Sequence, residues 1–212
     1  MLLLAFDTAT PAVTAALHDG ERVLAESTTI DARRHGELLA PLIEKTLAHA
    51  GASIRDVTAL VAGTGPGPYT GLRVGLVTAQ GLATSLGVPA YGVCTLDALA
   101  YGSGLREEFL VATDARRKEV FWARYSSFDD RLDGPHVDKP ADVPVNGLPV
   151  VGPSLYPEIL GEPQAPPYPL AGFLAALAAG RLAAGERLDE PRPIYLRRPD
   201  AVEPGAPKKV IQ

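Results

Sequence analysis

The chain has 212 residues and a net charge of -5; 46% of the residues are hydrophobic and 21% are charged. A chain of this length forms one large domain or two of about 100 residues each. Its acidic balance argues against autonomous, electrostatically driven nucleic-acid binding, because such binding needs clustered lysine and arginine side chains. Short basic runs at 33–34, 116–118 and 197–198 leave room for a local basic patch.

The only cysteine is Cys94, which excludes an internal disulfide framework and a multi-cysteine metal site. Residues 2–6 are apolar and lead straight to Asp7, as in a first strand and unlike a signal peptide. No uninterrupted apolar stretch approaches the roughly 18 residues that span a bilayer. We therefore expect a cytoplasmic protein that does not contact a membrane.

The first half of the chain alternates strand-like and helix-like patterns. Asp19-Gly20 is typical of a hairpin turn between two strands. Beyond the hairpin, apolar residues take a helical period, and Gly51 ends that helix. The predicted strands are 2–6, 13–18, 22–29, 60–62 and 88–93, and the predicted helices are 35–50, 69–86 and 96–102, the last capped by Thr95.

A second unit begins near residue 103. It opens with two strands and a charged turn, after which ten prolines between Asp133 and Pro169 predict irregular structure. A helix follows, and we expect the polar tail beyond it to be mobile. The predicted strands are 109–113, 119–125 and 149–152, and the predicted helix is 170–184. The element order predicts a two-lobed α/β fold, with a mixed sheet and flanking helices in the first lobe.

The most informative segment is a glycine-rich loop at 63–68 between a strand and a long helix. Such a loop can present backbone N–H groups to an anion, which makes Asp7, Thr8, Gly65 and Gly67 candidate anion-binding residues. It lacks the lysine of a phosphate-binding loop and the spacing of the dinucleotide fingerprint. Asp7 can orient a metal-bound water or phosphate, or cap the neighbouring turn, and the residues alone favour the cap.

The other reactive side chains give little support for catalysis. The four histidines show no i, i+4 pair, so no metal site is expected. A turn or capping role suits His35, which starts a helix, better than catalysis. There is no Gly-x-Ser-x-Gly motif, and Cys94 is best interpreted as a small core residue at a strand end.

Helix 69–86 carries small residues every four positions: Gly71, Gly75, Ala79 and Ala83. This ridge allows another helix to approach closely. Each interior glycine costs roughly 1 kcal/mol relative to alanine, so the two glycines need a packing reason. The ridge packs either against the protein's own sheet and first helix or against a partner, and the pattern alone does not decide between them.

Five motifs are spread through the chain. They are Leu3–Thr10, His35–Pro41, Gly65–Arg73, Asp114–Val120 and Pro193–Arg197. Together they resemble the TsaB (YeaZ-like) family, the non-catalytic subunit of the bacterial complex that makes N6-threonylcarbamoyladenosine in tRNA. The glycine-containing third motif is highly specific, and the resemblance covers essentially the whole chain.

The resemblance implies a fold like the actin, hexokinase and Hsp70 ATPases (the ASKHA, ribonuclease H-like class). Its lobes would be 1–102 and a reduced, proline-rich 103–212. It also implies kinship with the catalytic threonylcarbamoyltransferase subunit TsaD, of the glycoprotease (peptidase M22-like) family, whose Asn-His-x-x-x-His-like motif binds a metal. Thr95 and Leu99 stand where that paralogue has histidines, and leucine cannot coordinate a metal. No metal and no transferase chemistry are therefore expected here.

In the family, two helices of the first lobe pair with those of TsaD, and the same surface can form homodimers. We therefore expect a scaffold that activates TsaD for modification of adenosine 37 of tRNA. A TsaE-type ATPase would complete the complex, tRNA would be contacted indirectly, and ATP or ADP would bind only at the level of the complex. The expected interface residues are Leu38, Leu39, Leu42, Gly71, Leu72, Gly75, Leu76 and Ala79, and Gly75→Leu should abolish the heterodimer while the lobe stays folded.

A second hypothesis is a nucleotide-binding ATPase or kinase of the actin-like superfamily. Fold analogy favours it, but fold does not establish function. Peptidase activity is the weakest hypothesis, because the sequence offers neither a nucleophile nor a metal site.

Overall fold

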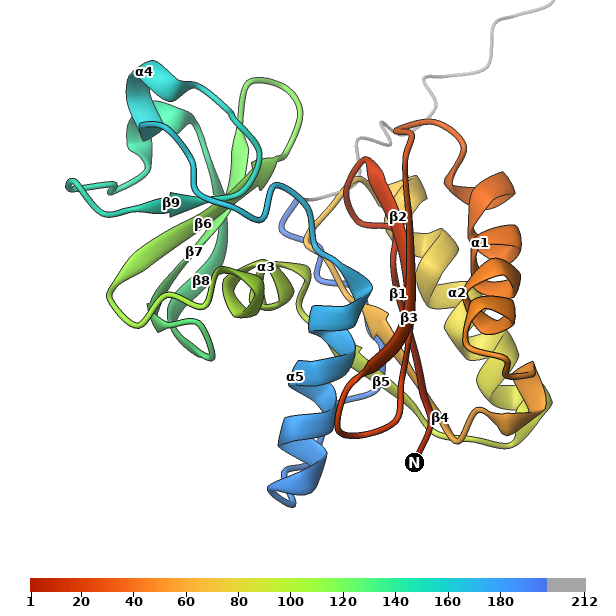
Figure 1. Ribbon diagram of the computed structural model, residues 1–212. Coiled ribbons are helices and arrows are strands. Elements are labelled where there is room, and N and C mark those ends of the chain that lie inside the picture. Colours follow the sequence, from red (N-terminus) through yellow and green to blue (C-terminus); the bar gives the residue numbers. More distant parts are fainter. Residues whose placement is uncertain (198–212) are drawn as a thin grey trace, which may run out of the picture.

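The computed structural model describes residues 1–197. Two lobes, each built around its own sheet, lie side by side (Figure 1). The polar tail and Arg198, for which we made sequence predictions, lie outside the described residues. None of the helices in residues 1–197 is long and apolar enough to cross a membrane.

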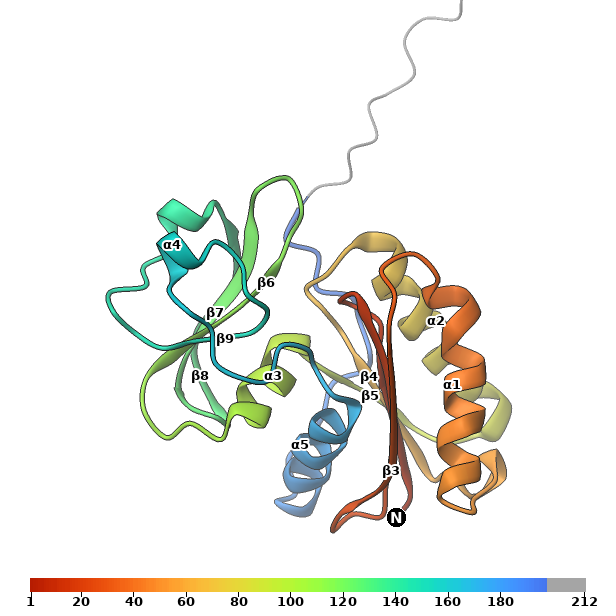
Figure 2. The ribbon, with the colours of Figure 1, turned by 45° about the horizontal axis from the view of Figure 1, so that its top comes forward.

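The first lobe holds a five-stranded sheet in the order β3-β2-β1-β4-β5. Strand β1 pairs antiparallel with β2 and parallel with β4, and β4 pairs parallel with β5. Two helices cover one face of the sheet and α5 covers the other (Figure 2). The elements are β1 (Leu3–Asp7), β2 (Ala12–His18), β3 (Val23–Ile30), α1 (His35–His49), a 3-10 turn η1 (Ile54–Asp56), β4 (Ala59–Gly63), α2 (Tyr69–Leu86), β5 (Ala90–Val93) and α5 (Ala171–Ala183).

Alternate residues of the central strands face two separate cores. Leu4, Phe6 and Leu60 lie under α1 and α2. Leu3 and Ala5 face the opposite way and pack against α5. Side chains alternate across a strand, so covering both faces buries every residue of β1, β2 and β4.

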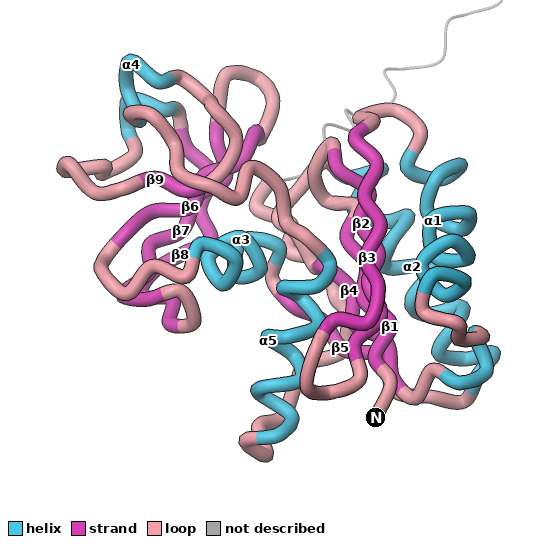
Figure 3. The backbone as a smooth tube through the Cα atoms, viewed as in Figure 1, coloured by secondary structure: helices cyan, strands magenta, loops and turns pink. Residues whose placement is uncertain are grey.

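The second lobe holds a four-stranded sheet in the order β8-β7-β6-β9. Helix α3 connects the two sheets and packs against α5 on one side and against β6 and β7 on the other (Figure 3). The elements are α3 (Thr95–Ser103), β6 (Phe109–Asp114), β7 (Val120–Ser127), β8 (Asp130–Asp138), a 3-10 turn η2 (Pro140–Asp142), β9 (Val150–Val151) and α4 (Pro157–Leu160).

The predicted strands and helices are present, with ends shifted by at most two residues. The prediction of irregular structure from Asp133 onward is wrong for β8, which runs to Asp138. This strand lies at the edge of its sheet and is exposed or half-buried throughout, so it lacks the apolar alternation that identifies strands. Gly134 and Pro135, which also lie within it, are typical of edge strands.

The C-terminal third of the chain returns to the first lobe. Helix α5 packs on β1 and β2 rather than on the second sheet. After it, the Gly92 amide donates to the Asp189 carbonyl at 2.8 Å, and the Ile194 amide donates to the Thr64 carbonyl at 2.9 Å. The first lobe is thus completed by segments that follow the second lobe in the chain, and a boundary at residue 103 stays a prediction.

Candidate functional site

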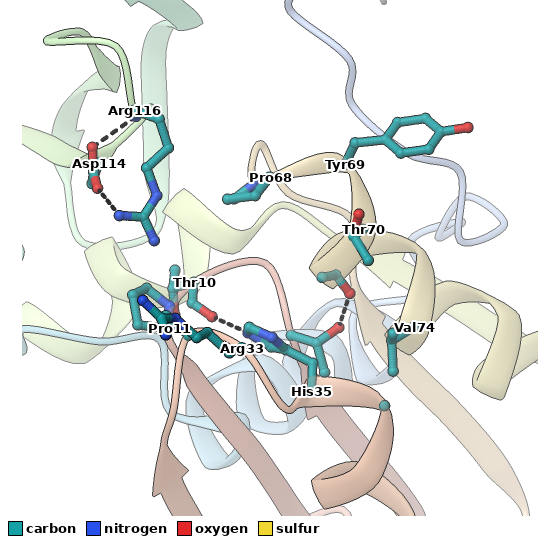
Figure 4. A pocket seen from close by; sticks show the side chains of 14 residues that line it. Thr10, Pro11, Arg33, His35, Pro68, Tyr69, Thr70, Val74, Asp114 and Arg116 are labelled. Atoms are coloured by element: carbon teal, nitrogen blue, oxygen red, sulfur yellow. Dashed lines mark hydrogen bonds and ion pairs between the residues drawn. The ribbon is translucent and has the colours of Figure 1, made fainter.

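A pocket of about 230 Å³ lies between the two lobes, at the end of the first sheet where β1 stops (Figure 4). Segments distant in sequence line it: the loop after β1, the starts of α1 and α2, and the turn between β6 and β7. Its polar lining includes Thr8, Thr10, Arg33, His35, Thr70, Asp114 and Arg116. Of the four predicted anion-loop residues, this lining contains Thr8 alone.

Asp7 is completely buried and does not line the pocket. Its carboxylate accepts hydrogen bonds from the Ala9 amide at 2.7 Å and from the Thr95 hydroxyl at 2.6 Å. A Cβ atom at Gly63 would overlap the same carboxylate. Burial raises the pKa of Asp7 to about 6, although the bonds from Thr95 and Ala9 oppose the shift. The interpretation of Asp7 as a turn cap is therefore confirmed.

Thr8 connects the end of β1 to helix α2. Its hydroxyl donates to the Gly71 carbonyl at 2.7 Å and accepts from the Gly75 amide at 3.0 Å. In a regular helix those two groups bond to each other, so the hydroxyl takes the place of one turn's hydrogen bond. A Cβ at Gly71 would lie 2.7 Å from the Thr8 carbonyl oxygen, and one at Gly75 would lie 2.7 Å from Thr8 Oγ1. Glycine at both positions therefore leaves the space that Thr8 occupies.

Gly65 and Gly67 hold the loop against its own neighbours. The Gly65 amide donates to Thr95 Oγ1 at 3.0 Å, and its carbonyl accepts from the Thr95 amide at 2.8 Å. A Cβ at Gly67 would overlap the Ala9 carbonyl, so only glycine lets these two loops cross. The Gly65 amide is already bonded within the protein, so the prediction that it meets a bound anion is not supported.

Basic side chains give the pocket its charge. Arg33 and Arg116 face it from different lobes, and Arg116 pairs with Asp114 at 3.2 Å (Figure 4). The His35 Nε2–H donates to the Thr10 carbonyl at 2.8 Å, as the turn-supporting role requires. Sequence reasoning did not place Arg33, Arg116 or Thr10 at the site. The short basic runs were the only signal for the two arginines.

The turn that carries Arg116 has an unusual backbone. Arg116, Arg117 and Lys118 have φ angles of 61°, 58° and 61°, a left-handed conformation that non-glycine residues seldom adopt. The Arg116 amide donates to Asp114 Oδ1 at 2.7 Å, and the Ala115 amide donates to the Glu119 carbonyl at 3.1 Å. These bonds hold the strained turn, which exposes three consecutive basic side chains.

The residues that replace the paralogue's histidines have structural roles. Leu99 is fully buried in the core between α3 and the second sheet. Thr95 is the first residue of α3, and its hydroxyl bonds to Asp7 and Gly65, so the prediction that it caps this helix is wrong. Cys94 is buried as expected, and burial raises its pKa to about 12. Within residues 1–197, no group of three or more His, Cys, Asp or Glu side chains could hold a metal ion.

Seven of the eight predicted interface residues are buried within the chain itself. They form the inner face of the helix pair, against the sheet; these seven are Leu39, Leu42, Gly71, Leu72, Gly75, Leu76 and Ala79. Only Leu38 is partly exposed. The prediction that these side chains form a contact surface is therefore corrected, because the ridge packs against the protein's own strands and helix. Gly75→Leu would strike Thr8 and damage the lobe instead of testing an interface.

The opposite side of the same helices is exposed. We call it the outer helix face, and it contains Ala40, Pro41 and Glu44 of α1 and Val77, Gln80 and Gly81 of α2. Val77 keeps 62% of its surface exposed, although it lies in the middle of a long helix. A Cβ at Gly81 would have no neighbour within 4 Å. This face carries mostly small side chains and has an apolar centre.

Comparison with known proteins identifies the family. A family model described as tRNA N6-adenosine threonylcarbamoyltransferase, TsaD, matches residues 22–169. A protein of Mycobacterium tuberculosis strain H37Rv, described as uncharacterized, is 45% identical over 206 residues, which cover 94% of this chain and 93% of that protein. The tRNA threonylcarbamoyladenosine biosynthesis protein TsaB of Escherichia coli K12 is 40% identical over 128 residues, 59% of this chain and 55% of its own length.

Solved structures agree with the sequence matches. The structure of YeaZ from Pseudomonas aeruginosa superposes with a TM-score of 0.77 at 30% identity and covers 92% of this chain and 99% of its own. A second Pseudomonas aeruginosa structure, described as similar to peptidase YeaZ, gives a TM-score of 0.78. The two-lobed α/β fold is thereby confirmed, whereas its kinship with the actin and hexokinase ATPases stays a prediction. The chain belongs to the TsaB/YeaZ family.

Proposed function

We propose that this chain is a non-catalytic scaffold subunit in the formation of N6-threonylcarbamoyladenosine at adenosine 37 of tRNAs, and that it binds and activates the catalytic subunit TsaD. The names of its relatives support the pathway: the TsaB proteins of Escherichia coli and Haemophilus influenzae are described as tRNA threonylcarbamoyladenosine biosynthesis proteins. The match to the TsaD family model supports kinship with the transferase.

Three observations support a non-catalytic role. Thr95 and Leu99 occupy the positions that the resemblance assigns to metal-binding histidines. Asp7 sits where β1 meets the interlobe pocket, but it is buried and holds the Thr95 hydroxyl and the Ala9 amide. Cys94 is buried, and its raised pKa keeps it a thiol rather than a nucleophilic thiolate.

The outer helix face is the proposed docking surface for TsaD, and its exposure is the observation that carries the proposal. The inner face of α1 and α2 is consumed by the protein's own core, whereas Val77 lies open at the centre of α2. Small residues such as Gly81 and Ala40 allow a partner's helices to approach closely. In the same proposal, a TsaE-type ATPase and any ATP or ADP join only at the level of the complex, and a homodimer can form through the same face.

Reconstitution tests this function. Purified chain, TsaD, the TsaE-type ATPase, ATP and tRNA, supplied with a threonylcarbamoyl donor, should form the modified nucleoside, and omission of this chain or of TsaD should abolish the product. Activity of this chain alone would overturn the non-catalytic role. Full activity of TsaD without it would overturn the scaffold role. Calorimetry of the isolated chain with ATP and magnesium separates the ATPase alternative, which requires tight binding and turnover.

A further inference from the structure

Three short basic runs, distant in sequence, meet at one end of the molecule. The loop before α1, the turn between β6 and β7, and the last described residues all lie at the end drawn at the top of Figures 1 and 2. Arg33 and Arg116 line the interlobe pocket together. Arg116 also lines a second cavity of about 410 Å³, together with Arg117 and Arg197. We call this the basic end, and it comprises Arg33, Arg34, Arg116, Arg117, Lys118 and Arg197.

The basic end stands out against an acidic protein with a net charge of -5. Three of its acidic neighbours are each paired with an arginine. Asp31 pairs with Arg34 at 2.8 Å, Asp114 pairs with Arg116 at 3.2 Å, and Glu119 pairs with Arg197. Arg33 and Lys118 add further positive charge, so basic side chains outnumber acidic ones here. Clustered charge of this kind attracts a phosphate backbone.

The second cavity has the lining that a nucleobase needs. Tyr69, Phe121 and Tyr195 contribute aromatic rings to its walls. The Tyr69 and Tyr195 rings stack with centroids 5.4 Å apart, and 53% and 46% of their surfaces remain exposed. Exposed aromatic rings beside arginines are the usual platform for unpaired bases, because every base offers a face for stacking.

We propose that the basic end binds single-stranded RNA, with backbone phosphates on Arg33, Arg116 and Lys118 and one unpaired base in the aromatic cavity. The basic charge and the aromatic cavity are features of the structure, whereas the choice of RNA as the bound polyanion rests on the proposed function. Because the basic cluster is small, few phosphates are contacted. Binding is therefore modest and strongly weakened by salt, with a slope of about 0.7 per phosphate contact on a single strand.

The test measures fluorescence anisotropy of the full chain with a labelled RNA hairpin that has a single-stranded loop. The triple variant Arg33→Gln, Arg116→Gln, Lys118→Gln should weaken binding about tenfold or more and reduce the salt slope by about two. A matched triple variant, Arg22→Gln, Arg55→Gln, Arg187→Gln, makes the same change in net charge at residues that line neither cavity. It should bind the hairpin like the wild type. Equal losses for both triple variants would overturn the proposal.

The aromatic cavity has its own variants. Tyr195→Ala should weaken binding of the hairpin by about five- to hundred-fold, the range for loss of one stacked base. Tyr195→Phe keeps the ring and should bind normally, which shows that the loss is one of stacking. Both variants should bind a fully paired RNA duplex as tightly as the wild type does. If Tyr195→Ala binds the hairpin like the wild type, no base stacks in the aromatic cavity and that part of the proposal is wrong.

Two outcomes separate this inference from the proposed function. If the triple variant binds RNA like the wild type while reconstituted activity depends on the chain, the scaffold role stands and the RNA site is wrong. If the triple variant loses TsaD but still binds the hairpin like the wild type, the basic end is a protein interface, which also overturns the RNA site.

Discussion

The Gly75 amide donates its hydrogen bond to the Thr8 hydroxyl at 3.0 Å, across 67 positions of sequence. The same hydroxyl donates to the Gly71 carbonyl, so the end of β1 is joined to the first turns of α2. This junction explains two glycines in a helix interior where alanine is otherwise preferred. It also places the start of α2, and with it the outer helix face, at a fixed position against the sheet.

Gly75→Ala should lower the free energy of unfolding by about 1–3 kcal/mol, the usual cost of overpacking a core. The new Cβ would lie 2.7 Å from Thr8 Oγ1, a buried atom held by two hydrogen bonds. Gly81→Ala, on the same helix with open space around it, should instead gain up to about 1 kcal/mol. Urea denaturation of both variants checks the pair. Equal effects would show that Thr8 does not dictate the glycine.

Asp7→Asn should remove a pH dependence of stability. The pKa of Asp7 is raised from 3.8 to about 6, so the folded state binds the proton more tightly than the unfolded state. The stability that this provides is complete below pH 3.8 and is lost as the pH rises through 6, by about 3 kcal/mol for a shift of two units. The difference in unfolding free energy between wild type and Asp7→Asn should fall by this amount from about pH 4 to about pH 8. If this difference in unfolding free energy does not change with pH, the pKa of Asp7 is not raised.

Thr95→Val should cost about 1–3 kcal/mol, because the Gly65 amide and the Asp7 carboxylate both lose a buried partner. Thr84→Val makes the same chemical change on exposed α2 surface, where the hydroxyl donates to the Gln80 carbonyl. It should stay within about 0.5 kcal/mol of the wild type. Thermal or urea unfolding distinguishes the two. If Thr95→Val leaves the free energy of unfolding unchanged, this hydroxyl does not stabilise the loop.

Asp97→Ala should destabilise the contact between lobes. Asp97 accepts from the Tyr125 hydroxyl at 2.8 Å and pairs with Arg131 at 3.1 Å and Arg181 at 3.8 Å, groups from both lobes. Loss of the carboxylate leaves the buried Tyr125 hydroxyl without its hydrogen-bond acceptor, and leaves Arg131 and Arg181 without this anionic partner. The expected cost is about 3 kcal/mol, at the low end for buried pairs because 31% and 30% of the arginine side-chain surfaces stay exposed. Asp142→Ala, at an exposed position, is the control and should be near neutral.

The elements of the first lobe could be predicted because their patterns are strong. Strands buried on both faces give continuous apolar runs, and α1 and α2 give clear helical periods that end at Gly51 and Gly87. Strand β8 could not, because an edge strand with Pro135 inside it carries no such pattern. The turn at Arg116 was predicted, but not its left-handed backbone, which depends on hydrogen bonds formed only in the fold.

The candidate site was harder to predict than the fold. A helical period identifies a face of small and apolar residues but does not say what covers it, so Gly71 and Gly75 were assigned to a partner. The structure turns both glycines toward Thr8, which no local pattern pairs with them. The basic end escaped prediction for the same reason, since Arg33, Arg116 and Arg197 become neighbours only when the two lobes and the C-terminal segment come together.

The dissociation constant of the heterodimer with Gly81→Leu shows whether TsaD docks on the outer helix face. A leucine here points into open space and favours the helix, so the chain should stay folded and become slightly more stable. Gly180→Leu is the matched control, because it makes the same change at an open, exposed position of α5. If TsaD docks there, Gly81→Leu weakens the heterodimer by about tenfold or more, equivalent to about 1.4 kcal/mol or more, while Gly180→Leu leaves it unchanged. A heterodimer of normal affinity with Gly81→Leu, or equal weakening by both variants, would contradict docking on this face.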